Sequence, residues 1–300
     1  MGEQNQPSMT IGAVSRATGV PTNTLRTWER RYGFPQPKRS SGGQRLYSPD
    51  IVPRLRLVAR ALSLGHRPGQ IMVLAEAELL ALIDPRPGPL MQASDRTVHV
   101  VERWMSAIEA LDGPRFESML DAELSTLGLM SFLIDRIGPF TQAVGDRWLA
   151  GEIEVYQEHF ATQRMEGFLG RHWRSMSDLA TGPSVVCACL PGERHVLGLH
   201  MAACVFALGG YRVVFLGADA PEADIAVAAN QCSSVAVAIS VSEHARASGV
   251  VAQVDALKRH LRRGAAIVLG GGGVPDLVDG AVCLPGLDAL GDWARARLTE

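Results

Sequence analysis

The sequence predicts a multidomain α and α/β protein with a winged helix-turn-helix, a four-helix bundle and a doubly wound parallel sheet, in that order. Three observations predict this fold class: a basic N-terminal region with helical spacing, four helical segments after a Pro-rich stretch, and short apolar runs that alternate with helices from residue 182 on. We expect the winged helix at 1–80, a linker at 81–95, the bundle at 96–180 and the α/β domain at 181–300.

The composition is that of a globular protein with an uneven charge distribution. Hydrophobic residues make up 47% and charged residues 20%, and neither a bilayer-length apolar stretch nor a signal pattern is present, so we expect a cytoplasmic protein without a membrane partner. Residues 1–70 hold eleven Lys and Arg against three Asp and Glu, whereas the remaining residues hold 18 against 28. A basic module on an acidic body indicates a polyanionic partner for that module.

The first 50 residues have the apolar spacing and the turn residues that are typical of a winged helix-turn-helix. Apolar residues at Ile11, Val14 and Ala17 predict a short helix, Gly19 ends it, and Pro21 opens a second helix. The segment SSGGQ predicts a hairpin turn in a basic wing. The second helix and the wing carry hydrogen-bond donors suited to base edges and phosphates. We expect DNA contacts from Thr22, Asn23, Thr24, Arg26, Arg30, Arg31, Lys38, Arg39, Arg45 and Tyr47.

These motifs resemble the DNA-binding domain of the MerR family of regulators. The resemblance rests on TIGAVSRATGVPTNTLRTWERRYG, GGQRLYSPD and LRLVARALSLGHRPGQI, which cover about residues 9–75 without a gap. It implies a double-stranded DNA operator and a homo-oligomer on two-fold-related sites. A basic helical domain that binds a protein partner is the alternative.

The bundle carries a tryptophan and a Glu-His pair. The apolar spacing of the bundle segments does not show the role of these residues. Its four segments have apolar residues three to four apart. Trp148 ends the third segment, and Glu158 and His159 lie on the fourth. On these grounds alone, the tryptophan would be core and the Glu-His pair a solvated surface.

The C-terminal region predicts a parallel sheet with a ligand site at one edge. The runs SVVCACL, YRVVFLGAD, SVAVAISVS and AIVLGGGG are continuous apolar strands, and ligands bind beyond the carboxyl ends of such strands. His195 follows the first run, Ser240 and Ser242 end the third, and Gly270 to Gly273 end the fourth. A dinucleotide fold is the rival, but the turn PGERHVLG lacks the G-x-G-x-x-G pattern.

This arrangement resembles the cobalamin-binding domain, whose pattern is usually D-x-H-x-x-G, then S-x-L, then GG. The chain has Glu193-x-His195-x-x-Gly198, then Ser240-x-Ser242, then the glycine run, so Glu193 and Ser242 depart from the pattern. The resemblance implies that His195 is the metal ligand, bound to cobalt from below, and that the glutamate sets its tautomer. It also implies a pocket for the nucleotide tail at Gly198, Ser240, Ser242, Gly271 and Gly272.

With this domain order, the bundle resembles the cap of the light-responsive CarH/LitR transcriptional repressors. The resemblance implies that Trp148, Glu158 and His159 line the upper face of adenosylcobalamin, with methylcobalamin and hydroxocobalamin as other forms. It implies a dimer or tetramer that binds DNA in the dark and releases it when light breaks the Co–C bond. Leu149 stands where members of that family have a histidine. Three alternatives follow: His159 or water substitutes for it, the photoproduct is a different species, or the usual light response is lost, which favours a sensor of cobalamin abundance or redox state.

Two further alternatives stay open. One is a corrinoid enzyme of methyl transfer, which the DNA-binding module and the lack of a substrate barrel disfavour, so we expect no enzymatic activity. The other is a regulator whose α/β domain binds a different ligand or none.

Overall fold

The chain forms two compact units, each of which is described by itself. The computed structural model describes residues 8–40, 42–63, 66–83, 95–243, 247–275 and 277–298. One unit comprises Met1–Leu111 and Phe140–Phe160, and the other comprises Asp112–Pro139 and Ala161–Glu300. Among the described residues, no helix has the length and apolarity that crossing a bilayer requires.

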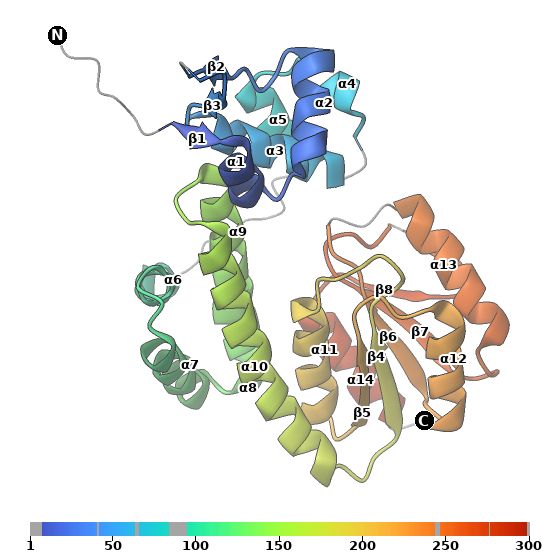
Figure 1. The fold of residues 1–300 in the computed structure, drawn as a ribbon. Coiled ribbons are helices and arrows are strands. Elements are labelled where there is room, and N and C mark those ends of the chain that lie inside the picture. The colour runs from blue at the N-terminus through green and yellow to red at the C-terminus, as the bar shows by residue number, and fades with distance from the viewer. Residues whose placement is uncertain are drawn as a thin grey trace. The chain divides into compact units, whose positions relative to one another are not determined.

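The first unit begins with the predicted winged helix-turn-helix (Figure 1). Gly19 ends the first helix with a φ of +70°, and Pro21 precedes the second, so both predicted boundaries are confirmed. The wing is an antiparallel sheet of order β1-β3-β2, in which β2 pairs with β3. One residue of the predicted turn between them, Ser41, lies outside the described residues. The elements are β1 (Met9–Thr10), α1 (Ile11–Thr18), α2 (Thr22–Tyr32), β2 (Lys38–Arg39), β3 (Arg45–Tyr47), α3 (Ile51–Ser63), α4 (Pro68–Ile71) and α5 (Glu76–Ile83).

The four predicted helical segments of the middle region are confirmed, one of them in three pieces. They are α6 (Asp95–Glu109), α7 (Gly113–Leu127), the series α8 (Leu129–Phe132), π-helix η1 (Leu133–Ile137) and α9 (Gly138–Ala150), and α10 (Val155–Leu179). In the first unit, Trp104 of α6 packs edge-on against Phe140 of α9, with ring centroids 5.3 Å apart. In the second unit, Phe132 of α8 packs against Phe168 of α10. Most of the predicted linker, from residue 84 to 94, lies outside the described residues.

The second unit is the predicted doubly wound α/β fold. Its five parallel strands have the order β5-β4-β6-β7-β8, and their continuous apolar runs are buried because helices cover both faces. In Figure 1, α11 and α14 lie on one face and α12 and α13 on the other. The elements are β4 (Ser184–Ala188), α11 (Leu197–Leu208), β5 (Arg212–Gly217), α12 (Glu222–Gln231), β6 (Ala236–Ser240), α13 (Ala247–His260), β7 (Ala266–Gly270), β8 (Val282–Leu284) and α14 (Leu287–Leu298).

The strand order places a topological switch point between β4 and β6. The chain leaves β4 toward α11 on one face and leaves β6 toward α13 on the other. Diverging connections of this kind open a crevice beyond the carboxyl ends of the two strands, where α/β sheets bind ligands. The loops that follow β4 and β6 carry Glu193, His195 and Ser242 to that crevice.

Candidate functional site

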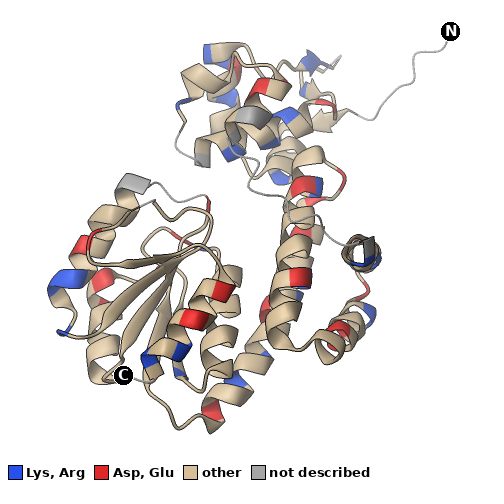
Figure 2. Cartoon of the chain, turned by 180° about the vertical axis from the view of Figure 1, so that it is seen from behind, with Lys and Arg blue, Asp and Glu red and all other residues tan. Residues whose placement is uncertain are grey.

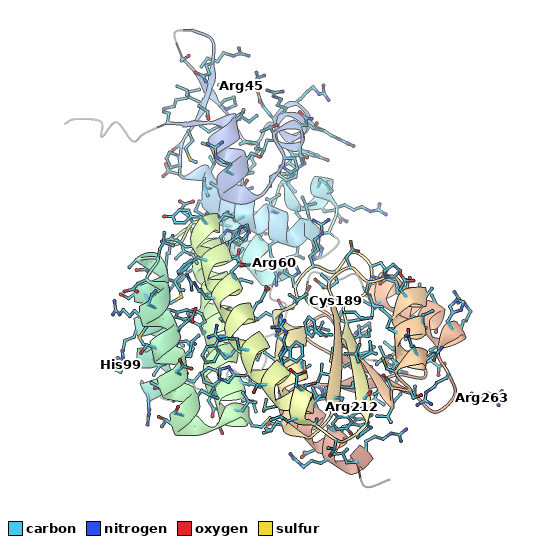
Figure 3. All side chains as sticks on the ribbon, turned by 60° about the horizontal axis from the view of Figure 1, so that its bottom comes forward. Arg45, Arg60, His99, Cys189, Arg212 and Arg263 are labelled. Carbon is cyan, nitrogen blue, oxygen red and sulfur yellow. The ribbon has the colours of Figure 1, made fainter. Side chains whose placement is uncertain are left out.

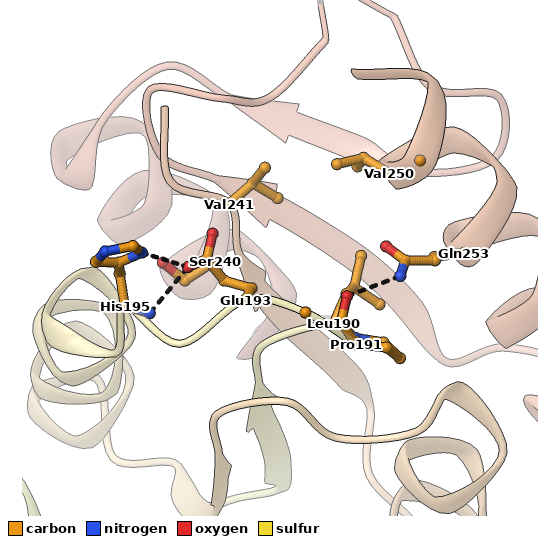
Figure 4. A pocket seen from close by; sticks show the side chains of 10 residues that line it. Leu190, Pro191, Glu193, His195, Ser240, Val241, Val250 and Gln253 are labelled. Carbon is orange, nitrogen blue, oxygen red and sulfur yellow. Dashed lines mark hydrogen bonds and ion pairs between the residues drawn. The ribbon is translucent and has the colours of Figure 1, made fainter. Parts of the chain in front are cut away.

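A buried carboxylate at the switch point joins a histidine of one loop to a serine of the other. Glu193 is 8% exposed. Its Oε1 accepts the backbone N–H of His195 at 2.8 Å and lies 2.7 Å from the Nδ1 of the same residue. Its Oε2 accepts the backbone N–H of Ser242 at 3.1 Å and the Ser242 hydroxyl at 2.5 Å. Three of the predicted residues therefore share one hydrogen-bond set, part of which Figure 4 shows.

The electrostatics of this set favour a metal-ligating imidazole. Burial raises the pKa of Glu193, but the hydrogen bonds from His195 and Ser242 outweigh burial and lower this pKa to about 2. The carboxylate is therefore ionised at neutral pH and favours a proton on Nδ1 of the imidazole. The lone pair of the neutral ring then lies on Nε2, and the side chain is 58% exposed. A histidine oriented by a carboxylate in this way is the usual form of a metal-bound histidine.

The loop that carries the histidine is held in place by Asp219, a residue that the sequence analysis missed. The Asp219 carboxylate accepts the backbone N–H of Gly192 at 2.7 Å, and the Asp219 N–H donates to the Glu193 carbonyl at 2.9 Å. Asp219 has a φ of +51°, an uncommon conformation that these two bonds support. Its position as the last residue of the second run, YRVVFLGAD, at the same sheet edge, was the signal that could have identified it.

A pocket of about 360 Å³ opens beside the histidine (Figure 4). Its lining comprises Leu190, Pro191, Gly192, Glu193, His195, Ser240, Val241, Gly249, Val250 and Gln253. Glu193, His195 and Ser240 belong to the predicted site, whereas the apolar members have the same sequence pattern as core residues. Gln253 donates its side-chain N–H to the Pro191 carbonyl at 2.9 Å and so steadies one wall. An apolar pocket of this size with a few polar groups suits a small organic ligand.

The predicted glycines allow close packing of neighbouring loops at this edge. A Cβ at Gly198 would lie 2.9 Å from the Ser240 hydroxyl oxygen, and one at Gly271 would lie 2.2 Å from the Val241 carbonyl oxygen. Gly271 also has a φ of +112°, which side chains rarely adopt. Gly198, Gly271, Gly272 and Ser242 are not among the described residues that line the pocket. Their contact with a cofactor stays a prediction, and the glycines have a packing role that was not expected.

The predicted cap residues belong to the first unit. The ring of Trp148 faces the guanidinium of Arg56, whose Cζ is 5.1 Å from the ring centroid. Glu158 and His159 lie side by side, with Oε2 and Nε2 3.5 Å apart and side chains 32% and 72% exposed. Leu149 packs against the hydrophobic core of the winged helix-turn-helix. The structure therefore directs the residue after the tryptophan toward the DNA-binding module.

The predicted DNA surface is largely exposed, with one exception. Lys and Arg outnumber Asp and Glu on the N-terminal module (Figure 2), and Arg45 marks its wing in Figure 3. Arg45 donates from Nε to the Glu29 carboxylate at 3.0 Å, and its side chain is 38% exposed. Tyr47 is only 1% exposed and belongs to the core, because its hydroxyl turns inward toward Glu29 at 3.5 Å. This corrects the expected surface position of Tyr47. The exposed or partly exposed set comprises Thr22, Asn23, Thr24, Arg26, Arg30, Arg31, Lys38, Arg39 and Arg45.

No protein cluster competes with the histidine for a metal in the described part of the chain. Within those residues, no three His, Cys, Asp or Glu side chains gather as a metal-binding group. Cys189, near the carboxyl end of β4 (Figure 3), donates to the His195 carbonyl at 3.6 Å, and burial raises the pKa of its thiol to about 12.

Comparison with known proteins gives consistent family matches along the chain. Residues 9–78 match the MerR HTH family regulatory protein model, and residues 100–171 and 183–291 match two B12 binding domain models. The chain is 32% identical to the HTH-type transcriptional repressor CarA of Myxococcus xanthus over 234 residues, which cover 78% of this chain and 76% of CarA. It is 28% identical to the HTH-type transcriptional repressor CarH of the same organism, over 87% of this chain and 88% of CarH.

The fold also has a counterpart among solved structures. The monomethylamine corrinoid protein of Methanosarcina barkeri superposes with a TM-score of 0.53 at 15% identity, covering 67% of this chain and 99% of that protein. At this identity, the likeness concerns the fold.

Proposed function

Because the chain belongs to the CarA/CarH family of MerR-type transcriptional repressors with B12-binding domains, we propose that it is a cobalamin-dependent repressor whose DNA binding responds to light. The observation that carries the cofactor assignment is the set of Glu193, His195 and Ser242 at the switch point of the sheet. The cytoplasmic location and the absence of enzymatic activity expected from the sequence stay predictions.

The residues at the sheet edge have the chemistry to hold a cobalamin. His195 would bind cobalt through Nε2, because Glu193 holds Nδ1 at 2.7 Å and is ionised. The apolar pocket beside it, with Ser240 on its wall, would hold the nucleotide tail. When bound as adenosylcobalamin, the cofactor supplies a cobalt–carbon bond that visible light cleaves. Methylcobalamin and hydroxocobalamin remain the alternative forms.

Residues of the first unit would contact the cofactor and the DNA. Trp148, Glu158 and His159 would contact the adenosyl group, and the exposed basic residues of α2 and the wing would contact the operator. Several modules held in one dimer or tetramer bind an operator with avidity, without new contacts per module. Loss of the group that Trp148 contacts would favour another arrangement of its helix end, and DNA affinity would fall.

A second function is favoured by the packing of Leu149. Members of the photoreceptor family that this chain resembles have a histidine at that position, whereas Leu149 has no metal-binding atom and packs against the winged-helix core. A sensor of cobalamin abundance or redox state, without the usual photoresponse, would need no ligand there.

Absorption spectra, gel filtration and operator binding separate the two functions. The protein is loaded with adenosylcobalamin in the dark and measured before and after green light, with His195→Ala as the variant without the proposed ligand. A light-driven change in spectrum, oligomer size and operator affinity supports the photoreceptor. Cobalamin-dependent operator binding that light leaves unchanged supports the cofactor sensor, and a protein that takes up no cobalamin contradicts both.

A further inference from the structure

An arginine of the DNA-binding module is completely buried under the helix end that carries Trp148. Arg56 lies on α3, and its side chain is 0% exposed. Its Nε donates to the Ala17 carbonyl at 2.9 Å, in the last turn of α1. Its Nη1 donates to the carbonyls of Trp148 at 2.5 Å and Ile153 at 3.0 Å. One guanidinium therefore joins the helix-turn-helix to the turn between α9 and α10.

The chemistry of a buried guanidinium makes this junction specific. A charge removed from water is tolerated only when its donors are satisfied, and here backbone carbonyls and the Trp148 ring surround it. Glu154 adds a partly exposed carboxylate 3.5 Å from Nη2. The planar fork of arginine reaches partners in several directions at once, whereas the ammonium of lysine is a compact point charge. A lysine at this position would keep the positive charge but lose the planar fork that reaches carbonyls of both segments at once.

Apolar and backbone contacts complete the docking of the same turn. Leu149 packs against the core of the winged helix-turn-helix, and Ile153 is 1% exposed. Gly151 has a φ of +78°, and a Cβ there would lie 3.4 Å from the Pro53 side chain on α3. Residues 148–154, which we name the Trp148 turn, therefore pack closely on the DNA-binding module.

We propose that Arg56 is a positioning residue that couples the position of the Trp148 backbone to the position of the helix-turn-helix. A displacement of the Trp148 backbone moves the acceptor of one arm of the guanidinium, while the other arm holds the last turn of α1. The arrangement of α1 and α2 on the operator then depends on the Trp148 turn. This inference rests on the proposed function, in which Trp148 contacts the cofactor.

The test compares Arg56→Lys with a matched control on the same helix. Arg54 also donates to two carbonyls, at Met72 and Leu74, but both belong to the DNA-binding module, so Arg54→Lys removes similar bonds without touching the Trp148 turn. Operator affinity is measured in the dark for the apoprotein and for protein loaded with adenosylcobalamin. We expect a loaded-to-apo affinity ratio of about 5–150 in the wild type and in Arg54→Lys, and a ratio of about 1 in Arg56→Lys.

A second readout requires no cofactor. The backbone amides of Gly151, Glu152 and Ile153 donate to the carbonyls of Trp148 and of Arg147, the residue before the turn. In the apoprotein, we expect hydrogen exchange at these three amides to be about tenfold faster in Arg56→Lys than in Arg54→Lys. Arg56→Met replaces the buried charge by a shorter, unbranched apolar chain and gives the same test if the lysine variant fails to fold.

The outcomes separate the inference from the proposed function. If the wild type binds the operator equally well with and without cobalamin, the proposed function is wrong, and the role of Arg56 falls with it. If the wild type responds and the Arg56 variants keep its affinity ratio, only the role of Arg56 is refuted. Unchanged exchange at the three amides in the Arg56 variants shows that Arg56 does not hold the turn, and likewise overturns the inference.

Discussion

Neutralising Glu193 should remove a pH-dependent share of the stability of the second unit. The carboxyl pKa falls from 4.5 to about 2 in the folded protein, against the opposing effect of burial. A shift of this size corresponds to about 3 kcal/mol of unfolding free energy at ~1.4 kcal/mol per pKa unit. Because the folded-state pKa is the lower one, this stabilisation is complete above the unfolded-state pKa and is lost as the pH falls toward 2.

Urea denaturation of the cobalamin-free chain at pH 7, 5, 4 and 3 measures this share. The wild type should exceed Glu193→Gln by about 3 kcal/mol at pH 7, and more than half of the pH-dependent difference should be gone at about pH 3. Asp121→Asn, which neutralises an exposed carboxylate on α7 of the same unit, serves as the control. A difference between wild type and Glu193→Gln that stays constant with pH would refute a buried carboxylate ionised by its hydrogen bonds.

Three further substitutions test the site and the DNA surface. His195→Ala should leave the chain folded, weaken cobalamin binding at least ~10-fold and change the dark absorption spectrum; an unchanged spectrum would contradict the ligand assignment. Asp219→Ala should release the Gly192 and Glu193 loop and weaken cobalamin binding by about 10-fold, measured by absorption titration, with operator binding of the apoprotein unchanged. Arg26→Ala should weaken operator binding and lower its salt dependence by about one counterion, while cobalamin uptake stays normal.

The helices and strands were predictable where the pattern of apolar residues along the sequence was clear. Ile11, Val14 and Ala17 gave the first helix, and the apolar runs gave four strands because both faces of a parallel sheet are buried. The fifth strand, Val282–Leu284, was missed because three residues are too few to show a period. The π-helix at Leu133–Ile137 was missed because its apolar spacing reads as continuous α-helix.

The sequence predicted the site residues that lie on loops at strand ends. It did not predict the residues whose positions depend on how loops and strands pack together. Glu193, His195 and Ser242 were expected together and meet in one hydrogen-bond set. Asp219 and the pocket wall at Gln253 depend on which loops lie side by side, which the strand order decides and no local pattern encodes. The burial of Tyr47 follows from its position opposite Met9 in the wing sheet, a register that the sequence does not state.

Two departures from the cobalamin-domain pattern meet in a single contact. Glu193 stands where the pattern has aspartate, and Ser242 stands where it has leucine. The glutamate reaches across the switch point, so that one oxygen faces the imidazole while the other accepts the backbone N–H and the hydroxyl of Ser242. A leucine would remove the hydroxyl bond and leave that second oxygen with the backbone N–H as its partner, and the loss of one hydrogen bond to a buried carboxylate is costly. The two changes therefore compensate each other, and what the site retains is an ionised, hydrogen-bonded carboxylate opposite Nδ1 of His195.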